Sequence, residues 1–570
     1  MQEFKLERGK QRDRLTVSRC GPDLLRYPLY NKGTGFTAEE RRRLNIDGAL
    51  PAQHNDIDKQ AGRIYTSIFF NEDPVGRNIG LAALQDRNEV LYYKVLREHL
   101  EEAMPIVYTP TVGKASQYYS RVFRRSRGIF VTPEHRGRIQ SVLENAAPFA
   151  GVKLMVVTDN EAILGIGDQG AGGMAISIGK LALYCVGAGI HPVRTLPISL
   201  DVGTNNQDLL NDPLYLGWRH ERLTGDDYLS LVDEFVAAAE QVFPGVVIQW
   251  EDFRKDNALM ILDRFKHSVP SFNDDIQGTG AVASACIAAG CRIRQTDLAD
   301  SRVVIYGAGA AGLGIYRQLR EQLARAGMSD DALQRAIAVM DSRGVITDDR
   351  DRLDAYKLEM AMPASLAAEL GLQGESVGDL AAVVAAYGAN VLVGASGQGG
   401  SFTEDVVAAL SANTDAPIIL PMSNPTSISE AVPEDLMRWT QGRALVATGS
   451  PFDPVELDGE ARRIGQANNV FVFPGIGLGA IVTDAAEISD GMIAASASAL
   501  AQSLSEDDIE SRSLVPDVSR LWEVCGDVAE AVAQQAIDEG VARADLTDVR
   551  AAIDDLRWVP NYPEIVVEGA

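Results

Sequence analysis

The chain lacks the features that mark several classes of protein. No stretch approaches about eighteen consecutive apolar residues, so the sequence predicts no membrane-spanning helix. The N-terminal segment MQEFKLERGKQRDRL has no apolar core of the kind found in secretory signal peptides. The five cysteines are an odd number without the paired spacing of a zinc site, which indicates buried thiols in a reducing compartment. These absences favour a cytoplasmic protein.

The chain also lacks an excess of positive charge. Its net charge of −26 argues against nucleic acid as a partner, because binding to phosphates requires concentrated lysine and arginine. Surface exposure best explains two short basic runs, 41–43 and 121–127, and an anionic effector site is the alternative. With 570 residues, 46% hydrophobic and 23% charged, the sequence predicts a globular protein of two or more domains.

The pattern of apolar residues changes along the chain. The first 130 or so residues are mostly helical and irregular; apolar side chains in 89–104 have helical spacing, and Pro105 and the segment 108–111 are expected to break this helix. Short apolar runs typical of buried strands then alternate with helical segments, at 152–159, 194–203, 246–250, 335–341, 390–397, 417–425, 444–450 and 469–475. We therefore predict an α/β fold with a doubly wound parallel sheet, and terminal helices from about residue 500.

Two acidic pairs follow predicted strands. Glu251 and Asp252 end the run IQWED, and Asp274 and Asp275 follow in SFNDD. Carboxylates that share a site repel one another, and a divalent cation removes this conflict. Mg²⁺ and Mn²⁺ bind carboxylate oxygens and leave coordination positions for water or substrate. The pairs therefore predict a metal site, and ordinary Asp-rich turns are the alternative.

The run Gly307-Ala308-Gly309-Ala310-Ala311-Gly312 fits the dinucleotide-binding pattern G-x-G-x-x-G. It directly follows the predicted strand VVIY and opens a helical segment. The first glycine allows a tight turn, the second lets the backbone approach the pyrophosphate, and the third permits close helix packing. The N-terminus of the helix, at Ala310 and Ala311, then supports the negative charge. A glycine-rich turn without a ligand is the alternative.

Asp341 is the acidic residue expected at the end of the next strand. A carboxylate at this position accepts hydrogen bonds from the ribose hydroxyls and repels a 2′-phosphate, which favours NAD. Asp341 lies further along the chain than the usual 20 or so residues, so the intervening helix or loop must be enlarged. Ser342, Arg343 and Lys357 would instead tolerate NADP, and the sequence leaves this choice open.

The chain strongly resembles the malic enzyme family, particularly its large bacterial NAD-linked type. The similarity runs from about residue 25 to 540 and is carried by IVYTPTVG, VVTDNEAILGIGDQG, IGKLALY, DVGTNNQDLLNDPLYLGWR, QWEDF, SFNDDIQGTG, GAGAAGLG, SNPTS, ATGSPF and NNVFVFPGIGLG. The resemblance implies an N-terminal malic domain over 1–277, a Rossmann-type NAD(P)-binding domain over 278–540 and a C-terminal tail over 541–570. It also implies a homodimer or homotetramer.

The family oxidises (S)-malate to pyruvate and CO₂, reduces NAD(P)⁺ and requires Mg²⁺ or Mn²⁺. The resemblance assigns the metal ligands to Glu251, Asp252 and Asp275. Its catalytic tyrosine and lysine correspond to Tyr108 and Lys180. The remaining assignments are Asp274 as the acidic neighbour of the lysine, and Asn424, Asn468 and Asn469 as contacts of substrate or cofactor. In this scheme Lys180 takes the proton of the C2 hydroxyl and Tyr108 returns a proton to C3.

One position departs from the family pattern. The family usually has an arginine that binds a substrate carboxylate in T-D-x-E-R-I-L-G, and this chain has Ala162 there. A hydrogen bond to a charged partner contributes roughly 1.5–3 kcal/mol, so its loss would weaken malate binding. Another cation, or loop amides and asparagines, would have to replace it, or the substrate differs. Malolactic chemistry, which yields lactate, and a catalytically silent NAD-binding protein therefore remain alternatives.

Overall fold

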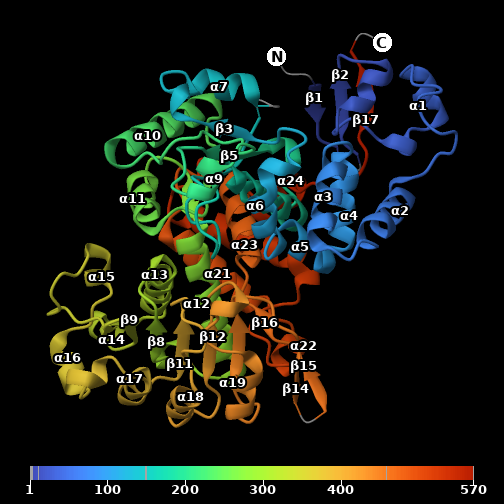
Figure 1. The fold of residues 1–570 in the computed structure, drawn as a ribbon. Coiled ribbons are helices and arrows are strands. Elements are labelled where there is room, and N and C mark those ends of the chain that lie inside the picture. The colour runs from blue at the N-terminus through green and yellow to red at the C-terminus, as the bar shows by residue number, and fades with distance from the viewer. Residues whose placement is uncertain (1–3, 10–11, 148–150, 458, 569–570) are drawn as a thin grey trace. The chain divides into compact units, whose positions relative to one another are not determined.

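The computed structural model describes residues 4–9, 12–147, 151–457 and 459–568 (Figure 1). The chain divides into two compact units, Met1–Phe253 with Arg550–Ala570, and Arg254–Val549. This division falls upstream of the family-based boundary at residue 277. The helix α11 (Lys255–Phe265) and the short helical turn η7 (Asp274–Gly278) both pack against α13 (Ala310–Arg325), and these contacts place them in the second unit.

The first unit begins with a helical region. Its helices are α1 (Ala38–Arg43), α2 (Ile57–Phe69), α3 (Pro74–Gln85), α4 (Glu89–Glu98), α5 (Leu100–Val107) and α6 (Thr111–Val122). The helix predicted over 89–104 is interrupted earlier than expected, at His99, whose φ of −126° and ψ of 43° are not helical. Pro105 lies inside α5 and does not end it. The helical content was thus predicted correctly, but the break was misplaced.

A small sheet joins the two ends of the chain. The strands β1 (Phe4–Glu7) and β2 (Arg14–Val17) are antiparallel, and β17 (Glu564–Val567) pairs with β2 in parallel. Ile565 of β17 is fully buried in a core cluster that also contains Leu15 and Val17. The end of the segment expected to be a tail is therefore an integral part of the first unit. Strands of four residues give too short a pattern to be recognised in the sequence.

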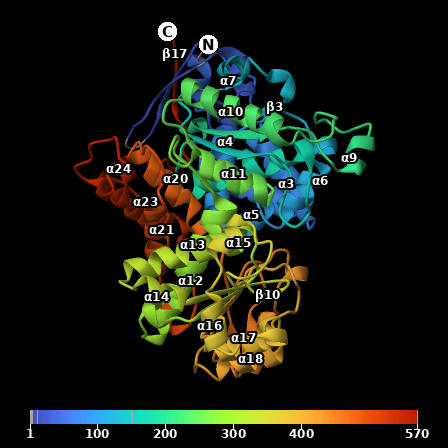
Figure 2. The ribbon, with the colours of Figure 1, turned by 90° about the vertical axis from the view of Figure 1, so that its left-hand side faces the viewer.

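A parallel sheet forms the core of the first unit. Four of its five strands are β3 (Ile129–Val131), β5 (Thr195–Leu200), β4 (Leu154–Thr158) and β6 (Val247–Trp250), in this order. Every residue of β4, β5 and β6 is buried, as is typical of parallel strands covered on both faces. The helices α7 (Ile139–Ala146) and α10 (Gly225–Val242) lie side by side (Figures 1 and 2). The helix α8 (Met174–Leu183) packs on β4 and β5. Of these strands, only β3 was not predicted.

One helical segment, Gly170–Ala188, is long and apolar enough to cross a membrane by length and composition alone. The most apolar part of this segment is 89% buried within the protein, which is the behaviour of a core helix. The free thiols of Cys185, Cys286, Cys291 and Cys525 are buried, as predicted. Cys20 is exposed, because it lies in the loop that precedes the first short helical turn of the chain.

The second unit contains a seven-stranded sheet with the order β10-β9-β8-β11-β12-β13-β16. The strands are β8 (Val303–Tyr306), β9 (Ile337–Asp341), β10 (Gly344–Val345), β11 (Val391–Gly394), β12 (Ile418–Pro421), β13 (Leu445–Thr448) and β16 (Gly465–Gln466). All neighbours are parallel except β10, which is antiparallel to β9. The strand order reverses between β8 and β11, so the predicted doubly wound topology is confirmed and the switch point lies at β8.

Four helices pack against one another beside this sheet: α12 (Thr279–Arg294), α20 (Phe473–Val482), α21 (Asp490–Gln502) and α23 (Leu521–Asp538). The strand predicted over 469–475 is wrong, because these residues form a short helical turn (Asn469–Phe471) and the start of α20. A short, fully buried apolar run has the same appearance in a strand and in a helix. Asn468 caps the turn and Pro474 lies in the first turn of α20, both of which favour a helix.

Candidate functional site

Two predicted catalytic side chains of the first unit converge on one carboxylate. The Lys180 Nζ lies 2.9 Å from Glu251 Oε1, and the Tyr108 hydroxyl donates a hydrogen bond of 3.1 Å to the same oxygen. Lys180 and Glu251 are each only 2% exposed. The ammonium also lies 5.1 Å from the centroid of the Tyr108 ring. Lys180, Tyr108 and Glu251 therefore form one buried, hydrogen-bonded group.

The position of Lys180 depends on a close approach of two helices. Lys180 belongs to α8, and Tyr108 directly follows α5. A Cβ atom on Gly179 would lie 2.5 Å from the backbone oxygen of Val107 and 3.3 Å from Cδ2 of Tyr108. Only glycine fits at this contact without displacing the backbone. This requirement could not be predicted from a local pattern, because it arises from two segments far apart in the chain.

The carboxylate of Glu251 is also held from the side of the sheet. Gln249 on β6 donates a hydrogen bond of 2.7 Å to Glu251 Oε2, and the hydroxyl of Tyr184 donates to the side-chain oxygen of Gln249. Gln249 and Tyr184 are fully buried. This chain of hydrogen bonds fixes the orientation of Glu251 at the end of β6. Sequence reasoning missed both residues, since an isolated glutamine in a strand carries no recognisable motif.

Asp252 adopts a left-handed backbone conformation with a φ of 58°. Its backbone oxygen accepts a hydrogen bond of 3.0 Å from the N–H of Ala162, and its Oδ1 accepts one of 3.4 Å from the N–H of Leu164. The loop in which the family has its arginine is therefore attached to Asp252 by backbone groups. At this position Ala162 contributes a backbone donor and no charge.

Arg222 is the buried cation that lies against this loop. Its guanidinium lies 3.3 Å from Asp159, 3.5 Å from Glu161 and 3.4 Å from Asp168. It also donates hydrogen bonds to the backbone oxygens of Asp159 and Gly203. Burial alone would lower the pKa of Arg222, but the three carboxylates outweigh it and raise the pKa. Arg222 is thus committed to holding the loop in place, a role the sequence did not reveal.

The second acidic pair lies in the second unit, at the end of β7 (Ser271–Asn273). Asp274 is fully buried, and the side-chain amide of Asn469 donates 3.0 Å to its Oδ2 and 3.1 Å to its backbone oxygen. Asp275 is half-buried. Asn468 uses its side-chain oxygen to cap the following turn, at 3.0 Å from the N–H of Val470. The contacts of Asn468 and Asn469 with substrate remain predictions.

The glycine-rich turn between β8 and α13 has the geometry that a dinucleotide requires. Gly307 has a φ of 128°, and a Cβ atom there would lie 2.3 Å from the backbone oxygen of Ala395. A Cβ atom on Gly309 would meet nothing within 4 Å, which leaves the space that an approaching pyrophosphate needs. A Cβ atom on Gly312 would lie 1.9 Å from the oxygen of Gly307. The three glycines thus have the separate roles that the motif predicts.

Ala310 and Ala311 form the first turn of α13, whose N-terminus faces this turn. The predicted enlargement before Asp341 is also present, because an additional helix, α14 (Asp330–Gln334), lies between α13 and β9. Asn424 follows β12 and is exposed, and the hydroxyl of Ser450 donates to its side-chain oxygen.

Asp341 lies at the end of β9, next to β8, with cations bound to its carboxylate. Arg350 donates two hydrogen bonds of 2.9 and 3.0 Å, and Lys357 donates one of 2.7 Å. Partial burial would raise the pKa of Asp341, but hydrogen bonds from Lys357, the Arg343 N–H and Arg350 outweigh burial and lower it. The carboxylate is therefore ionised at neutral pH, as an acceptor for ribose hydroxyls must be.

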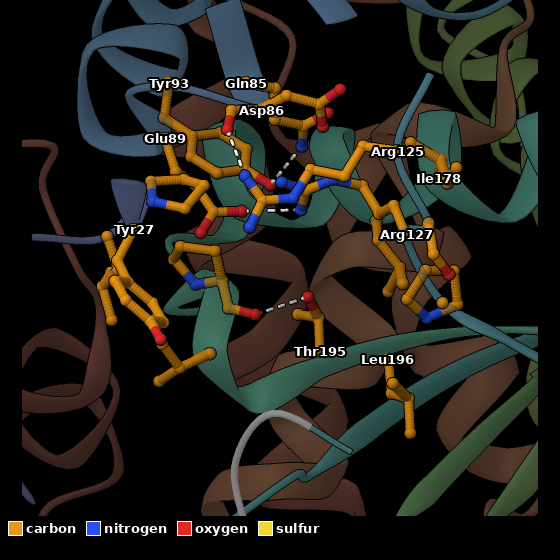
Figure 3. A pocket seen from close by; sticks show the side chains of 18 of the residues that line it. Tyr27, Gln85, Asp86, Glu89, Tyr93, Arg125, Arg127, Ile178, Thr195 and Leu196 are labelled. Carbon is orange, nitrogen blue, oxygen red and sulfur yellow. Dashed lines mark hydrogen bonds and ion pairs between the residues drawn. The ribbon is translucent and has the colours of Figure 1, made fainter. Parts of the chain in front are cut away.

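A separate cavity of about 400 Å³ lies in the first unit, lined by residues such as Tyr27, Tyr93, Arg125 and Leu196 (Figure 3). Its arginines are engaged by the protein itself. Arg127 lies 2.7 Å from Glu89, and Arg125 donates 2.8 Å to the backbone oxygen of Asp86. These contacts account for part of the second basic run without an effector.

The first basic run is not explained by surface exposure alone. Arg41 is buried and donates hydrogen bonds to the backbone oxygens of Phe36, Pro51 and Gln53. Surface exposure is therefore the wrong explanation for Arg41, whose guanidinium closes a loop by satisfying buried carbonyl groups.

Comparisons with known proteins agree over nearly the whole chain. Residues 85–266 match the family model "Malic enzyme, N-terminal domain", and residues 276–537 match "Malic enzyme, NAD binding domain". NAD-dependent malic enzyme 3 of Bacillus subtilis (strain 168) is 45% identical over 547 residues, 96% of each chain. NAD-dependent malic enzyme of Sodalis glossinidius (strain morsitans) is 43% identical over 549 residues, 96% of this chain and 97% of that protein.

Two solved structures share the fold. The malic enzyme of Entamoeba histolytica has a TM-score of 0.56 at 23% identity, with 90% of this chain and 92% of that chain covered. The malic enzyme of Pyrococcus horikoshii Ot3 has a TM-score of 0.54 at 23% identity, with coverages of 80% and 88%.

Substituting Gly179→Ala tests the helix contact that positions Lys180. We expect a loss of stability of about 1–3 kcal/mol, because the new methyl group overlaps the backbone oxygen of Val107. The matched control is Gly62→Ala in α2, where a Cβ atom meets nothing within 4 Å and alanine is favoured in a helix. Urea unfolding measures both. Equal effects of the two substitutions would show that the contact at Gly179 is not tight.

Proposed function

The chain belongs to the malic enzyme family, and we propose that it catalyses the oxidative decarboxylation of (S)-malate to pyruvate and CO₂ with reduction of NAD⁺. The observation that carries this proposal is the buried group of Lys180, Tyr108 and Glu251. In this group the proposed proton acceptor, Lys180, and the proposed proton donor, Tyr108, contact the same carboxylate. The carboxylate lies at the carboxyl edge of a parallel sheet, where α/β proteins bind their ligands.

We propose that Glu251, Asp252 and Asp275 hold one Mg²⁺ or Mn²⁺. All three offer hard carboxylate oxygens, the ligands that these ions prefer. Glu251 and Asp252 are adjacent in sequence and only 2% and 4% exposed, and burying two neighbouring negative charges requires compensating positive charge. Lys180 supplies one positive charge. A divalent cation would add positive charge at these carboxylates.

The residues of the first unit would move the two protons of the reaction. When bound, the divalent ion would supply Lewis-acid polarisation of the substrate oxygen, and NAD⁺ would serve as the hydride acceptor. Lys180, whose amine a bound cation would hold in the neutral form, would remove the proton of the C2 hydroxyl, and Tyr108 would deliver a proton to C3 after CO₂ leaves. Because both side chains contact Glu251 Oε1, a proton can return from Lys180 to Tyr108 through this shared contact.

The function is tested by product analysis with malate, NAD⁺ and Mn²⁺. We expect NADH, pyruvate and CO₂ in equal amounts, and no reaction in EDTA. Lys180→Ala and Tyr108→Phe should each lower kcat at least 100-fold, because each removes a proton-transfer group. The matched control is Lys114→Ala, which removes an exposed lysine of α6 and should retain full activity.

Three results would contradict this assignment. Lactate without net NADH would indicate malolactic chemistry, turnover in EDTA would exclude the metal, and NAD⁺ binding without turnover of malate would indicate a silent binding protein.

The preference for NAD⁺ is tested at Asp341. In Asp341→Ala the cations Arg350 and Lys357 lose their internal partner and become available to a 2′-phosphate. We expect the ratio of kcat/KM for NADP⁺ to that for NAD⁺ to rise about tenfold or more. Adding Arg350→Ala to this variant should remove most of the gain. An unchanged ratio would show that Asp341 does not face the ribose.

We also infer that the protein forms a homodimer or homotetramer. Tyr118, Phe123, Leu214 and Leu216 are large apolar side chains that are exposed. Their two segments are neighbours, because Arg121 lies 3.1 Å from Asp212 and the Leu216 N–H donates to Ser120. Grouped apolar side chains on a surface indicate an interface. Sedimentation equilibrium measures the assembly, and a monomeric mass at micromolar concentration would exclude it.

We propose a cytoplasmic location for this enzyme. Four of the five cysteines are free, buried thiols, which suits a reducing compartment. Fractionation of cells that produce the protein tests this, and recovery with the periplasm or membrane would contradict it.

A further inference from the structure

Glu430 is a fully buried carboxylate of the second unit that none of the roles above involves. Its exposed fraction is 0%, and it lies in the segment between β12 and α19 (Pro433–Trp439), against the loop that follows β11. Within the part of the chain that the structure describes, no lysine, arginine or histidine forms an ion pair with it. A buried charge without a cation is unfavourable unless hydrogen bonds replace the lost hydration. Its hydrogen bonds therefore show what this residue does.

Glu430 accepts hydrogen bonds from both loops. Ser396 in the β11 loop donates to Oε1 through its backbone N–H and its hydroxyl, each at 2.8 Å. Ser423 in the β12 loop donates to Oε1 through its hydroxyl at 2.6 Å and to Oε2 through its N–H at 3.3 Å. Because a backbone N–H points at each oxygen, both oxygens act as acceptors, as in an ionised carboxylate. Glu430 thus connects two loops that are far apart in sequence.

The β11 loop connected by Glu430 is also the support of the dinucleotide turn. A Cβ atom on Gly307 would lie 2.8 Å from the backbone nitrogen of Ser396, the same N–H that donates to Glu430. A Cβ atom on Gly394 would lie 2.5 Å from Cδ of Glu430. The Glu430 carboxylate, the β11 loop and the turn at Gly307 are therefore closely packed against one another. A shift of the Glu430 side chain moves the backbone against which Gly307 rests.

The β12 loop connected by Glu430 presents Asn424. Ser423 precedes this residue, and its hydroxyl accepts a hydrogen bond of 2.9 Å from the N–H of Gly397 in the other loop. Asn424 itself is exposed at the carboxyl edge of the sheet. Its backbone position is set by Ser423, and hence by Glu430.

We propose that Glu430 is a positioning residue for the dinucleotide. Its carboxylate holds the β11 and β12 loops together, and so sets the turn at Gly307 and the place of Asn424 before the cofactor binds. The inference rests on the proposed function in taking NAD⁺ as the ligand at this edge of the sheet. Preformed loops bind a ligand more tightly, because no ordering is required on binding.

The variant Glu430→Gln tests this role in the otherwise intact enzyme. An amide nitrogen must replace one acceptor oxygen, so a donor then faces the N–H of Ser396 or Ser423. We expect the dissociation constant for NAD⁺, measured by titration calorimetry without malate or metal, to rise about tenfold or more. The KM for NAD⁺ should rise more than the KM for malate. An unchanged NAD⁺ affinity with a lowered melting temperature would overturn the proposal.

Asp508→Asn is the matched control. Asp508 is also a buried carboxylate of the second unit, but it caps α22 (Glu506–Glu510) and pairs with Arg520 at 3.2 Å. We expect it to lower the melting temperature and leave the NAD⁺ affinity within twofold of wild type. A comparable loss of NAD⁺ affinity in Asp508→Asn would also overturn the proposal, because any destabilised second unit would then bind NAD⁺ weakly.

Two milder variants cover the case in which Glu430→Gln does not fold. Ser396→Ala and Ser423→Ala each remove one hydroxyl and keep the carboxylate. Each should weaken NAD⁺ binding about threefold, and unchanged binding in both would overturn the proposal. Because NAD⁺ binding is measured without turnover, a wild-type enzyme that binds NAD⁺ but does not oxidise malate would refute the proposed function and leave this inference standing.

Discussion

The side chains of Lys180 and Glu251 are buried 2.9 Å apart in the first unit, and the geometry of the proposed catalytic site depends on this contact. A charge of either sign alone in this interior would be strongly unfavourable, so Lys180 and Glu251 require each other. The surrounding structure is arranged for this pair. Gly179 has no side chain, so α8 can approach Tyr108 closely. Gln249 donates a hydrogen bond to the Glu251 carboxylate and fixes its orientation.

In the second unit a buried carboxylate is stabilised without a cation. Glu430 is buried and is satisfied by backbone and hydroxyl donors from two loops. Arg222 in the first unit shows the opposite arrangement, one guanidinium shared by three carboxylates. In each case a buried charge connects loops at the carboxyl edge of a parallel sheet, where backbone groups left by the strand ends need partners. Buried charges therefore hold these loops in position, as well as the side chains of the proposed site.

The differences between the sequence predictions and the structure have local causes. Residues 470–475 are buried, so the hydrophobicity of this run did not reveal whether it was a strand or a helix. The helix predicted over 89–104 breaks at His99, where no proline or glycine marks the end. The strand β17 is only four residues long and gains its stability from β2, at the other end of the chain. For β17, a tertiary contact outweighed the local pattern.

The sequence by itself determined the α/β class, the doubly wound order of elements and the glycine-rich turn before α13, and it predicted the acidic residues of the proposed metal site. These features depend on short patterns: buried runs that form strands, glycines at fixed spacing, and acidic pairs after strands. Only the tertiary structure decided which side chains hold these groups in place. Gln249, Arg222 and Glu430 act through partners distant in the chain, such as Asp168 for Arg222, and contacts of this kind leave no local trace in a sequence.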